Sequence, residues 1–196
     1  EGWKHQSASL HAARIAAKRR DRELAEALEA IFTPDAGRVN RIFVTYSESD
    51  AEWMNRLEVM VAPYLRSAEA ELDLWGDARI GPDEPCDVRI SEALRGAGVA
   101  VALVSADFLA SPFIVNHGLP ALVNAARDGG LQLLWAYVSA AGWEETPLEE
   151  FRATHDTATP LDARPKAEQN AILKSIAQQM KEAALAATGR FTHVPI

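Results

Sequence analysis

The sequence predicts an α/β protein, namely a flavodoxin-like open parallel sheet of about five strands with helices on both faces, preceded by an N-terminal helix. Two observations support this prediction. Short, nearly continuous apolar runs alternate with longer stretches of helical periodicity, which is typical of a parallel sheet whose strands are connected by helices. The length of 196 residues suits one ordinary domain with an additional element.

The N-terminal segment is expected to form one long helix over residues 4–33, because it contains neither proline nor glycine. Its apolar residues recur at spacings of three, four or seven, and they are Leu10, Ala13, Ala17, Leu24, Leu28 and Ile31. This narrow seam suits packing either on a partner helix or on the helix's own domain. The basic cluster Lys18–Arg20 is expected to be a solvated face of the same helix.

Pro34 and Gly37 mark a short linker after this helix. The predicted domain organisation is therefore an N-terminal helix and linker over residues 1–36, followed by the α/β domain over residues 37–190.

Four apolar runs are predicted to be buried parallel strands. They are residues 42–46, 71–75, 99–104 and 131–138, and a weak fifth strand is expected near residues 158–161.

Helices are expected between these strands. The first carries Trp53, Leu57, Met60 and Val61 and should end at Pro63, because proline disfavours a helix interior. The turn-rich residues 76–85 are predicted to be a loop, followed by a helix holding Val88, Ile90, Ala93 and Leu94. Residues 106–127 are expected to be helical but divided by Pro112 and Pro120, and residues 166–187 should form the last helix.

The composition excludes several classes of function. A formal net charge of −8 argues against a general nucleic-acid binder. Cys86 is the only cysteine, which excludes an internal disulfide and a cysteine-based zinc cluster and suits a cytoplasmic location. No apolar run approaches the roughly 20 residues that cross a bilayer, and the charged start is unlike a signal peptide. Because the chain begins with Glu1, we expect further domains beyond this sequence.

Ligands of open α/β sheets bind beyond the carboxyl ends of the strands. In this sequence that edge should be formed by Tyr46–Ser47, Trp75–Pro82 and Ser105–Ser111. These residues are the first candidates for a functional site.

The same segments resemble a known family. Residues 43–47, with Asp50 and Trp53 after them, resemble the first signature box of TIR (Toll/interleukin-1 receptor) domains. Residues 74–82 resemble the family's loop after the second strand, and residues 103–114 resemble the segment that begins its active-site helix. The tail of bacterial members is matched by Trp143, Thr146–Leu148 and Pro160–Leu161. The resemblance covers residues 40–187 and rests on four motifs in the family's order.

This resemblance implies an effector of bacterial immune signalling and antiphage defence that cleaves NAD at the nicotinamide–ribose bond. NAD would be the substrate, with no cofactor and no metal, and activity would follow self-assembly of TIR domains. The resemblance also implies a sensor domain or partner subunit outside this sequence. It implies no binding of nucleic acid or membrane by the TIR domain itself. The NAD-contacting positions would be Phe43, Tyr46, Ser47, Trp75, Asp77, Arg79, Ser105, Phe108, Ser111 and Ile114.

The sequence departs from the bacterial pattern in two places. The pattern has glutamate immediately before a Leu-Pro pair, and Gly118 precedes Leu119-Pro120 in this chain. Glycosyl transfer builds positive charge on the ribose, which a carboxylate stabilises, so catalysis should be lost or impaired here. Whether Gly118 is natural or engineered stays open. Cys86 also replaces a tryptophan, which we interpret as a local packing change.

Most of the candidate residues also have a structural interpretation. Trp75 and Phe108 either stack on the rings of NAD or pack within the domain, and Arg79 either pairs with the pyrophosphate or is solvated.

The remaining side chains have simpler expected roles. Ser47, Ser105 and Ser111 lie where strands turn into helices and are expected to cap those helices. His117 is expected at the surface, and Cys86 is expected to be an inert thiol.

The main alternative function is a non-catalytic TIR scaffold or adaptor that assembles through the loop at residues 76–85. A response-regulator receiver shares the predicted sheet and is partly matched by Glu48, Asp50 and Asp107, but no lysine is suitably placed after the fifth strand. A P-loop nucleotide enzyme is excluded because the sequence contains no G-x-x-x-x-G-K-[ST].

Overall fold

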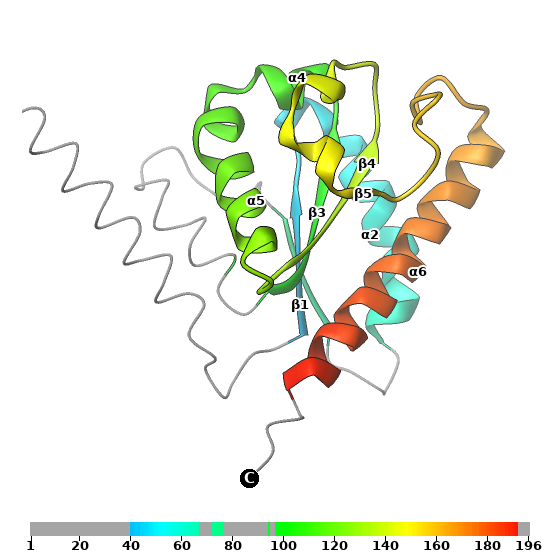
Figure 1. Ribbon diagram of the computed structural model, residues 1–196. Helices are drawn as coiled ribbons and strands as arrows, with labels where there is room; N and C mark the ends of the chain where they lie inside the picture. Colours follow the sequence, from blue (N-terminus) through cyan, green and yellow to red (C-terminus); the bar gives the residue numbers. More distant parts are fainter. Residues whose placement is uncertain (1–39, 67–71, 77–93, 95–96, 192–196) are drawn as a thin grey trace, which may run out of the picture.

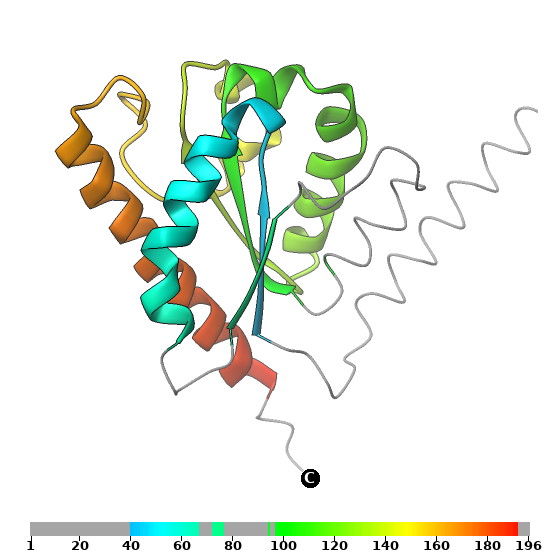
Figure 2. The same ribbon diagram turned by 180° about the vertical axis from the view of Figure 1, so that it is seen from behind.

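The computed structural model describes residues 40–66, 72–76, 94 and 97–191, which form a parallel sheet between two layers of helices (Figures 1 and 2). The five strands are all parallel, in the order β2-β1-β3-β4-β5. They are β1 (Asn40–Thr45), β2 (Leu72–Gly76), β3 (Ala97–Val104), β4 (Gln132–Tyr137) and β5 (Arg152–Ala153). The predicted fold class is therefore confirmed.

The longer helices are α2 (Ala51–Leu65), α4 (Ala106–Ala110), α5 (Leu119–Arg127) and α6 (Lys166–Phe191). Shorter turns are η1 (Glu48–Asp50), the π-helical turn η3 (Ile114–Gly118), η4 (Trp143–Glu145) and η5 (Pro147–Glu150). Figures 1 and 2 show α2 and α6 on one face of the sheet and α4 and α5 on the other. The prolines at 112 and 120 divide the helical stretch after β3, as predicted.

The central strand β3 is apolar and buried along almost its whole length, because helices cover both of its faces. Its alternate side chains enter two separate cores. Ala100, Ala102 and Val104 pack with Phe108 and α5, whereas Val99, Val101 and Leu103 pack with α2 and α6.

The prediction that Pro63 ends the first helix is wrong, because α2 continues through Pro63 to Leu65. A proline removes the N–H that would bond to the carbonyl four residues earlier, here that of Val59. The side chain of Val59 is 71% exposed, so this position is near water. The missing bond therefore costs little so close to the end of the helix.

The prediction of a fifth strand near residues 158–161 is also wrong, because β5 is Arg152–Ala153. After β5 the chain leaves the sheet and returns to the end of β4, where the Leu161 amide donates to the Tyr137 carbonyl at 2.9 Å. Arg164 closes the intervening loop by donating to the carbonyls of Asp156 and Thr159. Leu161 is thus buried because it anchors a loop to the sheet, although it is not part of a strand.

Gly98 lies in β3 where the strand packs closely against α6. A Cβ at this position would lie 2.7 Å from Cβ of Ala187, which is closer than two carbon atoms pack. We expect Gly98→Ala to destabilise the fold by about 1–3 kcal/mol, because inserting a methyl group into a packed core forces the helix outward. Urea unfolding followed by circular dichroism measures this difference. An unchanged unfolding midpoint would contradict the close packing of α6 on the sheet.

Several predictions fall outside the described residues: the helix over residues 4–33, the linker after it, the loop over residues 76–85 and most of the helix over residues 88–94. Within the part of the chain that the structure describes, no helix is both long enough and apolar enough to span a membrane.

Candidate functional site

The carboxyl ends of β1 and β3 are joined by a buried hydrogen bond at the upper edge of the sheet in Figure 1. The Ser105 hydroxyl donates to Oδ2 of Asp50 at 2.5 Å. The same hydroxyl oxygen accepts from the amide of Phe108 at 3.0 Å and so caps α4. The amide of Asp50 donates to the carbonyl of Ser47 at 2.8 Å, which forms the turn after β1.

Burial raises the pKa of Asp50 above its ordinary value of 3.8, and the nearby carboxylates of Asp107 and Asp162 raise it further. The hydrogen bond from Ser105 acts in the opposite direction. Asp162 in turn accepts from the Ser139 hydroxyl at 2.6 Å. This edge of the sheet therefore combines three carboxylates with two hydroxyls.

Asp50→Asn should keep the hydrogen bond to Ser105 and remove the charge. A raised pKa means that Asp50 stabilises the fold below about pH 3.8 and that this stabilisation is lost as the pH rises through the folded pKa. We therefore expect Asp50→Asn to be at least as stable as the native chain at neutral pH. Above pH 3.8 the free energy of unfolding of this variant should also change less with pH than that of the native chain. Urea unfolding at several pH values tests this, with the exposed Glu58→Gln as the control. A large loss of stability at neutral pH would show instead that the ionised carboxylate stabilises the fold.

The helical stretch that follows α4 contains a π-helical turn at its centre. The amide of Leu119 donates to the carbonyl of Ile114, five residues back. Pro120 explains this geometry, because it has no N–H for the carbonyl of Asn116 and its ring pushes that carbonyl away. π-turns inside helices occur frequently at functional sites.

Gly118 lies at the end of this turn and is buried. Its backbone has φ −63° and ψ −57°, an ordinary helical conformation. A Cβ added to Gly118 meets nothing within 4 Å among the described residues. As far as the described residues are concerned, neither backbone conformation nor crowding at Cβ requires glycine at this position.

The other candidate residues differ in how accessible they are. Phe43, Phe108 and Ile114 are at most 3% exposed and belong to the core between the sheet and α5. Tyr46 and Ser47 follow β1 and are half-buried. Trp75 lies in β2, in register with Phe43, and its side chain is outside the described residues. Asp77, Arg79 and Cys86 also fall outside them.

The capping prediction is confirmed for two of the three serines. Ser105 caps α4, and the Ser111 oxygen accepts from the Ile114 amide at 3.4 Å. Ser47 precedes η1 but makes no side-chain capping bond, so the prediction is wrong for that residue. His117 is exposed, as predicted, with its ring 6.2 Å from that of Phe113.

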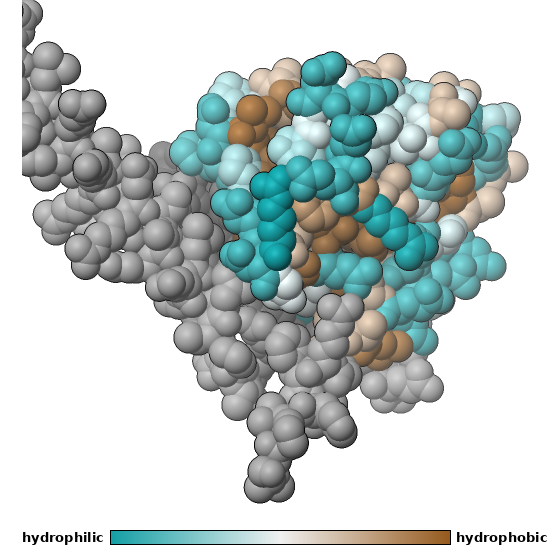
Figure 3. Space-filling model, viewed as in Figure 1, coloured by the Kyte–Doolittle hydropathy of each residue, from teal (hydrophilic) through white to brown (hydrophobic). Residues whose placement is uncertain are grey.

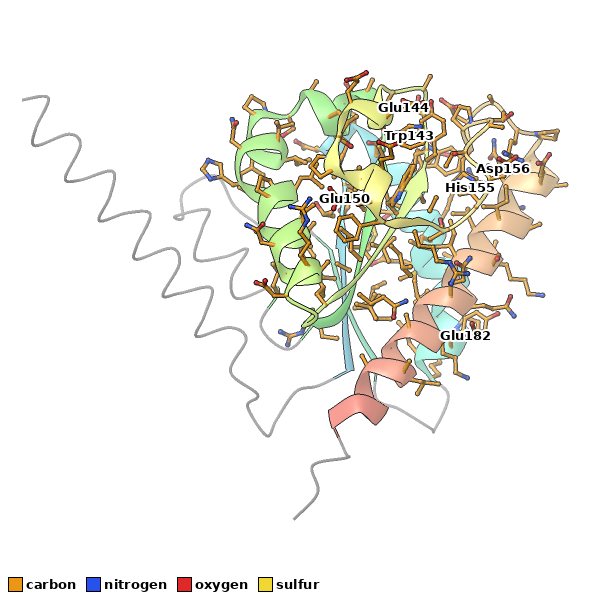
Figure 4. The ribbon with its side chains drawn as sticks, viewed as in Figure 1. Trp143, Glu144, Glu150, His155, Asp156 and Glu182 are labelled. Carbon is orange, nitrogen blue, oxygen red and sulfur yellow. The ribbon has the colours of Figure 1, made fainter. Side chains whose placement is uncertain are left out.

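The loops around β4 are anchored by three residues of the expected tail motif, namely Trp143, Thr146 and Leu148. The ring of Trp143 lies 4.8 Å from that of Trp135 and 6.3 Å from that of Tyr137 (Figure 4). Thr146 caps η5 by accepting from the Leu148 amide, and Leu148 is fully buried. These contacts give Trp143, Thr146 and Leu148 a structural role in holding the loops against the sheet. The indole N–H of Trp143 is buried without a hydrogen-bond partner among the described residues.

His155 is a second titratable group near β4 (Figure 4). Its Nε2 accepts from the Tyr137 amide at 3.1 Å, and its Nδ1–H donates to the carbonyl of Asp156 at 2.9 Å. Burial lowers the pKa of His155 below 6.5, and the charge of Arg164 lowers it further. The neutral ring is therefore the form that fits.

Because the pKa of His155 is lowered, the folded domain is expected to be less stable in mild acid. The contribution of His155 is present above about pH 6.5 and is lost as the pH falls through its lower folded pKa. We expect His155→Gln, which retains an acceptor for the Tyr137 amide, to lose less stability than the native chain between about pH 7 and pH 5. Urea midpoints at the two pH values measure the difference, and equal losses in both chains would contradict the assignment.

Two features of this site were not predicted as such from the sequence. The pairing of Asp50 with Ser105 depends on strand order, although an aspartate shortly after the first strand was a visible signal. The π-turn depends on Pro120, which was interpreted from the sequence only as a residue that divides the helical stretch. Among the described residues, no group of three or more His, Cys, Asp or Glu side chains is placed to hold a metal ion.

Comparison with known proteins yields little. No protein-family model matches the chain. The chain is 24% identical over 143 residues to a protein of Sinorhizobium fredii (strain NBRC 101917 / NGR234) named "Uncharacterized protein y4lF". The match covers 73% of this chain and 43% of that protein, so the chain spans less than half the length of its relative.

Proposed function

We propose that this chain is a bacterial-type TIR domain that binds NAD at the carboxyl edge of its sheet, with cleavage of the nicotinamide–ribose bond lost or impaired at Gly118. Two observations support the proposal. The four motifs occur in the family's order, and β1, β3 and the helices after them bring the first and third motifs to one edge of a flavodoxin-like sheet.

The environment of Gly118 is the observation that supports this proposal most. Glycine within a helix costs about 1 kcal/mol relative to alanine, yet this position has an ordinary helical backbone, and a Cβ added to it meets nothing within 4 Å among the described residues. A glycine without a structural reason, where the family has a glutamate, is what the loss of a functional side chain would leave.

The chemistry explains why the loss matters. In NAD hydrolysis the bond between ribose C1′ and the nicotinamide nitrogen breaks, and its electron pair stays with the nicotinamide, which becomes neutral. Water attacks C1′ and releases a proton, giving ADP-ribose. Positive charge develops on the ribose before the attack is complete, and a carboxylate beside it would stabilise that charge.

The acidic residues that the structure describes around the helical stretch do not evidently replace the missing glutamate. Asp107 is the only acidic residue between Ala106 and Arg127, and it lies in α4, which ends at Ala110 before the π-turn begins. Asp50 is buried and already bonded to Ser105. The chain therefore lacks an evident substitute among its described residues.

The proposed partners follow from the same assignment. They are NAD, other TIR domains that complete a shared assembly, and a sensor domain or subunit outside this sequence, all in the cytoplasm. The alternative is a TIR scaffold that assembles without any catalysis of its own. Gly118 is compatible with such a scaffold. The NAD-binding domain and the scaffold are distinguished by whether the carboxyl edge of the sheet binds NAD.

Titration of NAD into the ¹⁵N-labelled chain tests the proposal without requiring turnover. We expect the amide signals of Tyr46, Ser47 and residues 114–118 to shift and saturate, whereas nicotinamide alone at the same concentrations leaves most of them in place. Unchanged signals in an assembled sample would remove the NAD-binding proposal and leave the scaffold.

A further inference from the structure

An apolar groove of about 670 Å³ lies on the α4–α5 face of the domain. One wall is built mainly from apolar side chains of α4, η3 and α5, namely Ala106, Leu109, Val115, Leu119, Pro120 and Val123. The other wall comes from the segment around η4 and η5, with Ala141, Gly142 and Glu145–Pro147. Figure 3 shows apolar surface between polar side chains on this face.

The form of the groove suits a helix. Its wall runs from Val115 to Arg127, which is about 18 Å at a rise of 1.5 Å per residue. Two of its polar side chains are already engaged: Arg127 donates to both carboxylate oxygens of Glu150, and the Thr146 hydroxyl donates to the carbonyl of Trp143. The groove thus offers mainly apolar surface, and that is how grooves receive the apolar face of an amphipathic helix.

We propose that the occupant of this groove is the chain's own N-terminal segment, residues 4–33. The sequence of this segment predicts one helix with a narrow apolar seam that includes Ala17, Leu24, Leu28 and Ile31. From Ala17 to Ile31 the seam is about 21 Å long, which matches the length of the groove.

Charge complementarity fixes the direction of the helix. Glu145 lines the groove from η4, next to Glu144, which Figure 4 labels near the top of the domain, whereas Arg127 is the last residue of α5, which runs downward in Figure 1. In the N-terminal segment positive charge comes first: the basic cluster Lys18–Arg20 precedes residues 21–29, which carry four acidic residues and one arginine. A helix that runs parallel to α5 therefore places its basic cluster beside the glutamates of η4.

The connection to the domain permits this placement. β1 begins at Asn40, and β3 separates β1 from β4, so the two strands lie about 10 Å apart. α5 ends at Arg127, shortly before β4 begins at Gln132. The six residues 34–39 span up to about 20 Å, enough to bring a helix ending at Thr33 to the lower end of the groove.

Site-specific cross-linking of the full chain tests the proposal. In a Cys86→Ser background, Leu28→Cys is combined with Asn124→Cys, an exposed residue of the groove wall. The matched control combines Leu28→Cys with Val59→Cys, which is 71% exposed on α2 at the opposite face. With a short bismaleimide in dilute protein, we expect an intramolecular cross-link that forms on the order of ten-fold faster with Asn124→Cys, because docking raises the effective concentration of the pair.

Charge reversal supplies a second measurement that leaves the apolar contacts intact. Glu144→Lys with Glu145→Lys should slow the cross-link several-fold, and reversing Lys18–Arg20 to glutamates in the same chain should restore it. Equal rates for Asn124→Cys and Val59→Cys would overturn the proposal. So would a cross-link found only between two differently tagged chains, which would assign the groove to a second copy.

Discussion

Replacing Gly118 with glutamate is expected to raise the rate of nicotinamide release from NAD by about 10²–10³-fold, by analogy with the effect of one group that stabilises transition-state charge. The backbone at Gly118 is ordinary helix, and a Cβ there meets nothing within 4 Å among the described residues. The first carbon of the new side chain therefore has room among the described residues, and the side chain adds a carboxylate to a helical stretch whose only acidic residue is Asp107. Nicotinamide release by the native and variant chains, each at concentrations that favour assembly, measures the effect.

Two further variants separate charge from helix stability. Gly118→Gln has nearly the same size and no charge, and it should remain at the background rate of the native chain. Gly118→Ala should stabilise the domain by about 1 kcal/mol without any gain in turnover. A folded Gly118→Glu chain that binds NAD but releases no nicotinamide would favour the scaffold. Equal activity of the glutamate and glutamine variants would show that the carboxylate is not the cause.

Much of this fold could be predicted from the sequence because its strands are buried on both faces. β3 is a nearly continuous apolar run, and β1 and β4 contain shorter ones, a pattern that is typical of a parallel sheet covered by helices. The errors occurred where tertiary contacts decide the local structure. α2 passes through Pro63 in its last turn, and Leu161 is held by the carbonyl of Tyr137 without being part of a strand.

The candidate site was less predictable for a different physical reason. Sequence reasoning assigns residues to the edge of a sheet, but it does not give their burial. Phe43 and Ile114 were proposed to contact NAD and lie inside the core, whereas Tyr46 and Ser47 remain partly accessible. The bond between Asp50 and Ser105 spans 55 residues of sequence and arises only because β1 and β3 are neighbours.

Phe108 is the candidate whose two interpretations the structure separates most clearly, and Phe108→Ala is expected to destabilise the domain by about 3–5 kcal/mol. Its ring is fully buried between β3 and α5, in contact with the core that includes Phe43 and Ile114. Removing it leaves a cavity beneath the capped first turn of α4, the helix that leads into the π-turn. A loss of this size is a large part of the 5–15 kcal/mol that stabilises a typical domain.

Chemical denaturation followed by circular dichroism measures this loss, with Val59→Ala as a surface control that should change stability by no more than about 0.5 kcal/mol. Phe108→Leu refills much of the space and should cost roughly 1–2 kcal/mol, so the variant stays folded and its NAD binding can be measured. We expect that binding to equal that of the native chain, because Phe108 exposes no surface that a ligand can contact. A folded Phe108→Leu chain with greatly weakened NAD binding would instead show that the ring turns outward to meet the ligand.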